Sequence, residues 1–370
     1  MAVILNRRGF EPAKQLISKG RFRSPKAGRR RLPARAPKTS AAGKNRMRAA
    51  AIDRFGSPSV LAIHELPVPK PGPNEVLIAL YAAGVGVWDA DIRKGWWPQG
   101  KPKFPLVLGS DGAGVVAACG ARVRRFSEGD RVWAYEFINR KGGFYAEYVA
   151  LNSGHVALLP KRLNFVEAGA SAVTGLTALQ GIDVHLRVKA RDTVLVFGAT
   201  GAVGSLAVQF AKRHGARVVG TGRGKAAVEF IRKLGADKAV DVKRNDAAEQ
   251  VREFAPNGFN AVLALAGGDS LQQLLKLVRN GGRIAYPNGV EPEPKRPPKV
   301  KLVSYDAEVG LKQFERLNQA VEEAKLKAPI AAVFSLEEAA KAHARVEKGH
   351  LFGRIALRIR SDKQASARSR

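Results

Sequence analysis

The sequence contains very little cysteine. Cys119 is the single cysteine among 370 residues, so the chain forms no intramolecular disulfide and has no cysteine pair for a zinc lobe or a redox dithiol. We therefore expect a reducing compartment, with the cytoplasm as the favoured location. The six histidines lie far apart and show no H-x₃-H spacing, which indicates packing or surface roles and predicts no metal site.

Long hydrophobic runs are also missing. The longest uncharged run, residues 193–211, contains three glycines and changes its period in the middle, so it predicts a strand, a loop and a helix and no membrane span. Arg7, Arg8 and Lys14 interrupt the N-terminal stretch, which argues against a secretory signal peptide. A hydrophobic fraction of 45% excludes a wholly disordered chain, and the length predicts about two domains.

Acidic residues are scarce, and the resulting net charge of +31 is unevenly distributed. Residues 1–46 carry +13 and residues 358–370 carry +4, which leaves +14 on residues 47–357. The composition of residues 1–46 predicts a basic disordered extension, and residues 359–370 resemble a basic tail. The extension is interpreted as a mis-chosen start or functionless tail, an organelle-targeting peptide, or a polyanion-binding arm. Met47 opens the patterned sequence and favours the first interpretation.

From residue 47 onward the sequence shows regular apolar patterns, and the type of pattern changes near residue 170. Residues 47–170 show short β-rich runs separated by glycine and proline, which predict a partly closed β-barrel. Strand and helix patterns then alternate, which predicts a parallel sheet with helices on both faces. The expected strands are 193–197, 216–221, 238–242, 261–266 and 282–289, and the expected helices are 205–215, 225–235 and 271–281.

A glycine-rich turn follows the first of these strands. Gly201 lets a pyrophosphate approach the backbone, Gly204 lets the helix pack close to the strand, and the helix N-terminus supplies N–H donors. Ala199 occupies the place of the usual first glycine. We therefore predict dinucleotide binding by the turn, with the cofactor against Ala199, Thr200, Gly201, Ala202, Val203 and Gly204.

The end of the next strand indicates which dinucleotide is bound. An NAD site places an acidic residue there for the ribose 2′-hydroxyl, but residues 218–225 contain no acid. Thr221, Arg223 and Lys225 offer charge-assisted hydrogen bonds to a 2′-phosphate instead. This pattern favours NADP(H), although basic residues are abundant throughout the chain.

Several segments resemble the medium-chain dehydrogenase/reductase superfamily, specifically its zinc-independent, quinone oxidoreductase-like branch. They include FGSPSVLAIHELPVPKPGPNEVLI, PLVLGSDGAGVV, SEGDRVWAY, VLVFGATGAVGSLAVQFAKRHGARVVGT and SLEEAAKAHARVEKGHLFGRIAL. The resemblance covers roughly residues 47–358. It implies an α/β protein with a GroES-like β-barrel domain at 47–170, completed by 326–358, and a Rossmann NADP-binding domain with a doubly wound parallel sheet at 171–325. It also implies an active site between them and a homodimer joined through Rossmann sheet edges, around residues 301–305.

The chain departs from the zinc-dependent members of this superfamily at the positions of their metal ligands. Gly86 stands in place of the cysteine, and Ser110 and Asp111 replace the His-Glu pair. A catalytic zinc needs three protein ligands, so no metal is expected. Without a metal, hydride transfer favours acceptors that are already electrophilic, namely quinones and α,β-unsaturated carbonyls. Gly86 and Asp91 also stand where many relatives have Asn and Tyr.

The candidate site residues follow from the motifs and the resemblance. Asp89 is either a catalytic residue or a helix cap, and Tyr135 is either a hydrogen-bond donor to a carbonyl or a core residue. The predicted substrate pocket contains Trp88, Trp96, Trp97 and Ser110, whose aromatic members either stack on a quinone or pack in the barrel. Further cofactor contacts are expected from Thr174, Ala266, Gly267, Pro287, Asn288 and Arg354, with helix capping as the alternative for Thr174 and a surface position for Arg354.

Together these features predict an NADPH-dependent, zinc-free reductase of quinones or enones. An enoyl thioester reductase of the same superfamily is the alternative within enzymes. RNA or polyanion binding through the basic arms is the alternative of another class, but no RNA-reading motif accompanies the charge, so we expect neither a nucleic-acid nor a membrane partner.

Overall fold

The computed structural model describes residues 46–98 and 100–361. Residues 1–45 and 362–370, which hold nearly all of the expected basic extension and tail, lie outside the described residues. The expected tail includes residues 359–361, and here the structure differs from the prediction. Ile359 is buried and its N–H donates to the carbonyl oxygen of Tyr81 at 2.8 Å, so the chain stays packed against the fold at this point.

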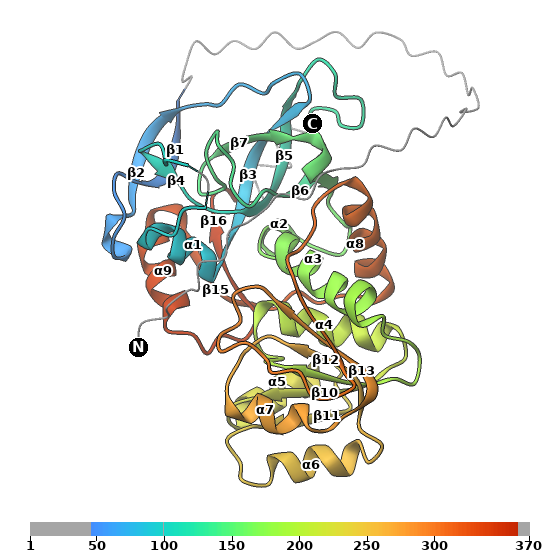
Figure 1. Ribbon diagram of the computed structural model, residues 1–370. Coiled ribbons are helices and arrows are strands. Elements are labelled where there is room, and N and C mark those ends of the chain that lie inside the picture. Colours follow the sequence, from blue (N-terminus) through green and yellow to red (C-terminus); the bar gives the residue numbers. More distant parts are fainter. Residues whose placement is uncertain (1–45, 99, 362–370) are drawn as a thin grey trace, which may run out of the picture. The chain divides into compact units, whose positions relative to one another are not determined.

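The first part of the described chain is β-rich, as expected. One sheet has three strands in the order β2-β1-β4, and a larger sheet has the order β15-β16-β3-β5-β6-β8, with β7 also paired to β3. Their bounds are β1 (Arg46–Ile52), β2 (Ala62–Pro67), β3 (Glu75–Val85), β4 (Leu106–Val107), β5 (Asp111–Cys119), β6 (Arg131–Tyr135), β7 (Tyr148–Asn152), β8 (Val156–Leu158), β15 (Ile330–Ser335) and β16 (Arg354–Arg358). The last two strands lie far along the chain from the others, and here β16 pairs with β3 while β15 pairs with β16 (Figure 1).

Residues 193–305 form a six-stranded sheet. Its order is β11-β10-β9-β12-β13-β14 and all its pairings are parallel, which is the strand order of a doubly wound Rossmann sheet. The strands are β9 (Thr193–Phe197), β10 (Arg217–Gly222), β11 (Lys238–Asp241), β12 (Phe259–Ala264), β13 (Val278–Pro287) and β14 (Lys301–Tyr305). The predicted fold class is therefore confirmed.

The apolar residues of β9 explain why the sheet is covered on both faces. Val194 and Val196 lie in one hydrophobic core, whereas Leu195 and Phe197 lie in another. Because successive side chains point to opposite faces, both faces of a continuous apolar strand need covering. The helices are α4 (Ala202–Arg213), α5 (Lys225–Lys233), α6 (Ala247–Phe254) and α7 (Asp269–Leu275).

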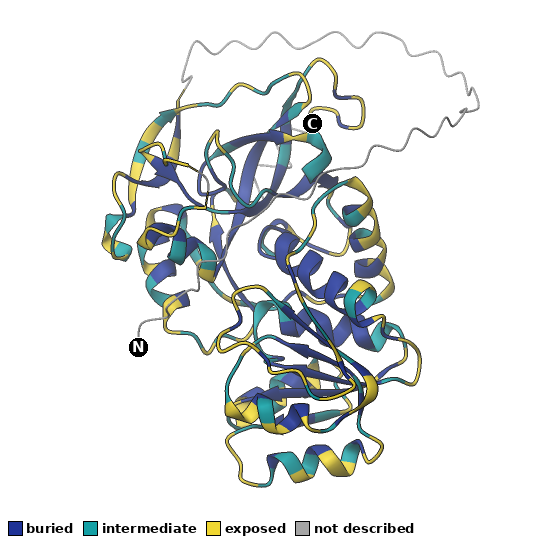
Figure 2. Ribbon diagram, viewed as in Figure 1, coloured by how far each residue is buried: buried dark blue, intermediate teal, exposed yellow. Residues whose placement is uncertain are grey.

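In the described part of the chain, five further helices connect or flank the sheets. They are α1 (Val87–Lys94), α2 (Phe165–Gly169), α3 (Ala172–Gln180), α8 (Leu311–Glu323) and α9 (Ala339–Glu347). Every residue of α3 is buried, as the dark blue of this helix in Figure 2 shows. Short helical turns at Pro58–Val60, Gly181–Leu186, Ser153–His155 and Leu336–Glu338 complete the described elements. Among the described residues, no helix is long and apolar enough to cross a bilayer.

One predicted element has a different extent. The expected helix at 271–281 ends at Leu275, and Val278 already belongs to β13, where it pairs with Phe259. The apolar spacing of residues 271–281 is compatible with one helix. However, pairing with β12 buries Val278 in the sheet, and this burial favours a strand from residue 278 onward. Gly281, which has a φ of 75°, lies where the β13 register against β12 shifts.

Candidate active site

Hydrogen bonds to β10 fix the glycine-rich turn between β9 and α4. The N–H of Gly198 donates to the hydroxyl of Thr221 at 3.1 Å, and the N–H of Ala199 donates to the Thr221 carbonyl oxygen at 2.9 Å. Gly198 adopts a φ of 88°, a conformation that favours glycine. The side chain of Thr221, expected to meet a cofactor phosphate, is buried and positions the turn.

The two glycines at the start of α4 have different surroundings. A Cβ at Gly204 would lie 2.3 Å from the carbonyl oxygen of Gly198, so the close packing of helix and strand requires glycine there. A Cβ at Gly201 would meet only that same oxygen, at 3.7 Å, so the space in front of Gly201 is open. Gly201 is the N-cap of α4 and no side chain caps the helix. These features leave room and N–H donors for an anionic group, as a dinucleotide pyrophosphate requires.

The end of β10 adds positive charge beside this turn. Arg223 and Lys225 are exposed, and Lys225 opens α5, whose first turn has neither an acidic residue nor a side-chain cap. Asp241, at the end of β11, accepts the N–H groups of Gly224 and Lys243, and these bonds lower the pKa of its carboxyl group. The two basic side chains therefore stand at the N-terminus of α5, where the Asp241 carboxylate already accepts the N–H of the N-cap residue Gly224.

The other expected cofactor contacts also lie at the carboxyl ends of strands. Ala266 and Gly267 follow β12, and a Cβ at Gly198 would lie 3.9 Å from the Ala266 nitrogen. Pro287 ends β13, and the Asn288 side chain donates to Asp306 at 2.7 Å. The sheet thus brings these segments to the edge where open α/β sheets bind ligands.

The last β-strand joins the barrel sheet to the glycine-rich turn. The N–H of Gly353 donates to the carbonyl oxygen of Thr200 at 2.8 Å, and Gly353 forms a bridge with Gly201. The next residue, Arg354, is only 4% exposed, so the surface alternative for this arginine is wrong. Its Nη2 donates to Asp111 at 2.8 Å, and its guanidinium lies 4.8 Å from the Trp88 ring centre. Its Nε and Nη1 are enclosed and have no partner among the described residues.

Asp111 connects this arginine to α3. Its second carboxylate oxygen accepts the N–H of Val173 at 3.1 Å. Burial raises the pKa of Asp111, and the Arg354 charge opposes that rise. Thr174, the next residue of α3, is buried and its hydroxyl donates to the carbonyl oxygen of Ala170 at 3.4 Å, whereas the N-cap of the helix is Ser171.

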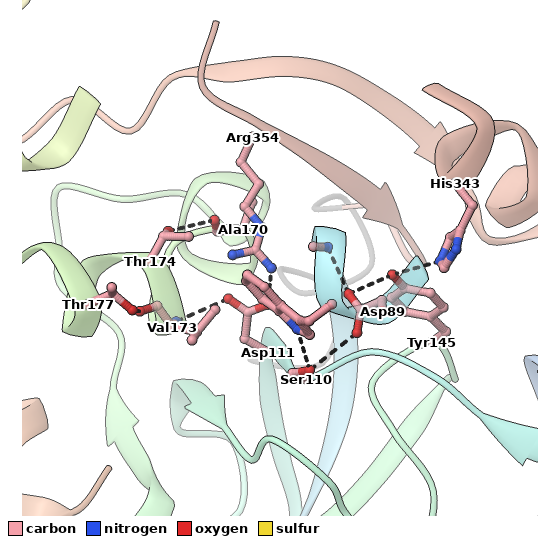
Figure 3. A network of polar contacts seen from close by, with 12 residues as sticks. Asp89, Ser110, Asp111, Tyr145, Ala170, Val173, Thr174, Thr177, His343 and Arg354 are labelled. Carbon is pink, nitrogen blue, oxygen red and sulfur yellow. Dashed lines mark hydrogen bonds and ion pairs between the residues drawn. The ribbon is translucent and has the colours of Figure 1, made fainter. Parts of the chain in front are cut away.

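A second polar network lies beside the first (Figure 3). The Trp88 indole Nε1 donates to Ser110 at 2.8 Å, and the Ser110 hydroxyl donates to Asp89 at 3.2 Å. Asp89 also accepts the N–H of Gly86 at 2.7 Å, which caps α1 as the capping interpretation expects. The Tyr145 hydroxyl donates to Asp89 at 3.1 Å and contacts His343 Nε2 at 3.3 Å.

Sequence reasoning missed Tyr145 and His343. They lie 56 and 198 residues from the groups they contact, and no local pattern marks either residue. A lone histidine in a helix and a tyrosine in a glycine-rich segment give no signal until the fold brings them together.

The remaining aromatic candidates are spread over this region. Trp96 is exposed, with its ring 5.9 Å from that of Phe137, whereas Trp97 packs against the barrel core. Tyr135 pairs with Asp111 across β5 and β6, and it is buried in the hydrophobic cluster against which Trp88 and Phe137 pack. The Tyr135 hydroxyl has no hydrogen-bond partner among the described residues and is not among their enclosed polar atoms. Burial raises the pKa of Tyr135, so the hydroxyl keeps its proton.

The residues at the expected ligand positions do not fit a catalytic zinc. Gly86 has no side chain, and a Cβ there would lie 2.4 Å from the Trp88 indole, which fills that space. The Ser110 hydroxyl is bonded to Trp88 and Asp89, and the Asp111 carboxylate is paired with Arg354. Zinc is bound by thiolates, imidazoles and carboxylates, and here one carboxylate remains, already neutralised by an arginine. Within the described residues no cluster of three such groups forms elsewhere.

Comparisons with known proteins agree with this architecture. Residues 72–161 match the family described as alcohol dehydrogenase GroES-like domain, and residues 202–301 match the family described as zinc-binding dehydrogenase. The mouse (Mus musculus) quinone oxidoreductase is 30% identical over 317 residues, which span 82% of this chain and 95% of the mouse protein.

Two solved structures illustrate the structural likeness. An NAD-dependent alcohol dehydrogenase is 33% identical with a TM-score of 0.79, over 85% of this chain and 100% of the other. A mycobacterial protein solved in complex with NADPH is 28% identical with a TM-score of 0.72, also over 85% and 100% of the two chains. With its barrel, its Rossmann sheet and these relatives, the chain belongs to the quinone oxidoreductase-like group of the medium-chain dehydrogenase/reductase superfamily, a family of oxidoreductases.

Proposed function

We propose that this oxidoreductase uses NADPH. The open face of Gly201 and the uncapped N-terminus of α4 would hold the pyrophosphate, and Arg223 and Lys225 would hold the 2′-phosphate. Arg354, one residue beyond the Gly353 bridge to Gly201, would add positive charge near the pyrophosphate. When bound, the nicotinamide supplies the hydride.

We propose quinones or α,β-unsaturated carbonyls as the substrates. One observation supports this choice. The Trp88 indole fills the position expected for a metal, and Asp111 is paired with Arg354. Because these residues provide no Lewis acid, the acceptor must be electrophilic on its own. The partly exposed Trp88, one face of which lies against Arg354, and the exposed Trp96 offer aromatic surface to a flat, conjugated molecule.

Tyr135 is the residue we assign to the substrate oxygen. Its buried ring fixes its position, and its unpartnered hydroxyl is free to donate a hydrogen bond where negative charge develops. Because burial raises its pKa, the group acts as a hydrogen-bond donor that keeps its proton. Asp89, enclosed beneath Trp88, does not have this access in the structure.

The test is a substrate panel with purified protein. We expect loss of the nicotinamide absorbance with NADPH and a quinone or an enone, and a much weaker response with NADH. Enoyl thioesters in the same panel examine the alternative within enzymes. Failure to oxidise NADPH with any acceptor, or stoichiometric zinc in the active protein, contradicts the proposal.

We also propose a homodimer through β14. This strand is the last of its sheet, it pairs only with β13 among the described strands, and four of its five residues are not buried. An unpaired strand edge is a template for pairing with a second chain. Sedimentation equilibrium should give twice the mass of one chain, and a monomer at micromolar concentration would rule the dimer out.

A further inference from the structure

The network beneath Trp88 is a continuous chain of hydrogen bonds. It runs from the indole of Trp88 through Ser110 and Asp89 to Tyr145 and His343 (Figure 3). Its four inner members are buried, whereas Trp88 is partly exposed. Trp88 is therefore the member of this chain nearest to the surface, and it covers the hydroxyl of Ser110.

The far end of the chain fixes the direction of its hydrogen bonds. Burial lowers the pKa of His343 to about 3, with the charges of Arg93 and Lys94 acting in the same sense, so the imidazole is neutral. His343 Nδ1 is enclosed without a partner. A proton on Nδ1 would leave an unsatisfied donor, so the favoured tautomer carries it on Nε2 and donates to Tyr145. Tyr145 must then donate its own proton to Asp89.

This direction determines which oxygen of Asp89 can carry a proton. Oδ2 accepts hydrogen bonds from the N–H of Gly86 and from the hydroxyl of Tyr145. With two donors already on Oδ2, an added proton belongs on Oδ1. Oδ1 is the oxygen that faces the Ser110 hydroxyl, at 3.2 Å.

The burial of Asp89 lets its carboxyl group hold a proton at higher pH than an exposed aspartate does. Burial raises the pKa of Asp89 to about 6, and the Asp111 carboxylate adds to that rise. The Gly86 N–H, the Arg354 guanidinium and the Tyr145 hydroxyl act in the opposite sense. A carboxyl group with such a pKa is suited to general acid catalysis.

We propose that Ser110 delivers to the substrate oxygen a proton stored on Asp89, and that Tyr145 and His343 are positioning residues for Asp89. This inference rests on the proposed reductase function. Tyr135 cannot replace this pair, because it holds its own proton too firmly. Ser110, which stands where zinc-dependent relatives have a metal ligand, then has a chemical role of its own.

The proton transfer balances the hydride transfer. Hydride adds to the acceptor and leaves a negative oxygen, which takes the proton of the Ser110 hydroxyl. The Ser110 oxygen takes the proton from Oδ1 of Asp89, which becomes a carboxylate. In this step protonated Oδ1 of Asp89 donates to the Ser110 oxygen, and the Ser110 hydroxyl turns its proton toward the substrate oxygen, which takes the place of the Trp88 indole once the indole moves off Ser110. Asp89 regains its proton from solvent when the product leaves.

The first experiment removes each member of the couple. In Asp89→Asn the amide keeps the cap on Gly86 but has no acidic proton, and Ser110→Ala breaks the link to the substrate. We expect kcat to fall about 100-fold in either variant, with unchanged NADPH affinity by fluorescence titration. We also expect the solvent isotope effect on kcat, measured in H₂O and D₂O, to change in both. Asp53→Asn and Ser127→Ala, at exposed positions, are the matched controls with wild-type rates.

The second experiment tests positioning through the pH profile. The wild-type kcat should fall tenfold per pH unit above about pH 6, as Asp89 loses its proton. The Tyr145 hydrogen bond lowers the Asp89 pKa, so Tyr145→Phe should move this fall to higher pH. A role of Tyr145 in packing alone would lower the rate or the stability without moving the profile.

The outcomes separate this inference from the proposed function. If the wild-type protein oxidises NADPH with an acceptor but Asp89→Asn and Ser110→Ala keep its rate and pH profile, the proton couple is wrong and the reductase stands. If the wild-type protein oxidises NADPH with no acceptor, both proposals fail. An infrared band of a protonated carboxyl group that disappears near pH 6, and that Asp89→Asn lacks, is expected independently of turnover.

Discussion

Gly201 and Gly204 stand three residues apart in the same turn but serve different purposes. The sequence predicts both roles from spacing alone, because a strand, a glycine-rich turn and a helix leave few ways to seat a pyrophosphate. The structure separates them through the space in front of each residue. An added methyl group clashes with backbone at Gly204 and enters open space at Gly201.

Alanine substitutions should distinguish these roles. Gly204→Ala should destabilise the fold by about 2 kcal/mol, because the helix must move away from the Gly198 carbonyl. Gly201→Ala should keep the wild-type unfolding midpoint in urea but weaken NADPH binding about tenfold or more, because its methyl group occupies the cradle. Equal losses of stability in the two variants would contradict this assignment.

Arg223 and Lys225 carry the prediction on cofactor choice. Each alanine substitution should raise the KM for NADPH about tenfold, because a charge-assisted hydrogen bond to the 2′-phosphate is lost. The KM for NADH should stay the same, since NADH lacks that phosphate. Steady-state kinetics with both cofactors provide the measurement, and an equal change for NADH would show that neither residue reads the 2′-position.

At the scale of elements, local pattern predicted most strands and helices but not their partners. The continuous apolar runs of β9 and β10 are local patterns, and they are sufficient to predict strands of the Rossmann sheet. The Asp111–Arg354 pair joins β5 to β16 across 243 residues, and its buried position depends on Gly84, where a Cβ would lie 2.6 Å from Asp111. Local sequence cannot show such a contact. The sequence therefore leaves two roles for Arg354, a contact to a cofactor phosphate or a surface position.

Removing one partner of the Asp111–Arg354 pair should lower the free energy of unfolding more than replacing both partners with apolar residues. Asp111→Asn leaves a buried guanidinium without its counter-charge and should lower the free energy of unfolding by about 3 kcal/mol. The double variant Asp111→Leu with Arg354→Met should recover most of this loss, because no unpaired charge remains. Urea denaturation of the wild type and the two variants gives the comparison, and a double variant no more stable than Asp111→Asn would refute a coupled pair.

At the scale of the whole molecule, two buried groups should give opposing pH dependences of stability. Folding raises the pKa of Asp89 from 3.8 to about 6, so its contribution to stability falls as pH rises through this interval. Folding lowers the pKa of His343 from 6.5 to about 3, so its contribution rises with pH between these values. The two effects offset each other between about pH 4 and 6.

Variants should reveal each effect separately. Relative to the wild type, Asp89→Asn should gain about 1.4 kcal/mol of stability per pH unit between pH 4 and 6, because the histidine effect is no longer opposed. His343→Gln should lose a similar amount per unit over the same range. Chemical unfolding at a series of pH values measures both slopes, and parallel curves for all three proteins would contradict the buried, neutral state of His343.

The course of β16 also has a consequence for synthesis. This strand, residues 354–358, pairs with residues 75–85 and completes their sheet. The preceding residue, Gly353, forms a bridge with Gly201 in the glycine-rich turn. The barrel therefore cannot close until residue 358 has left the ribosome, and until then part of one edge of β3 stays unpaired. A stop codon only a few residues upstream of Gly353 would abolish coenzyme support and barrel closure in a single event.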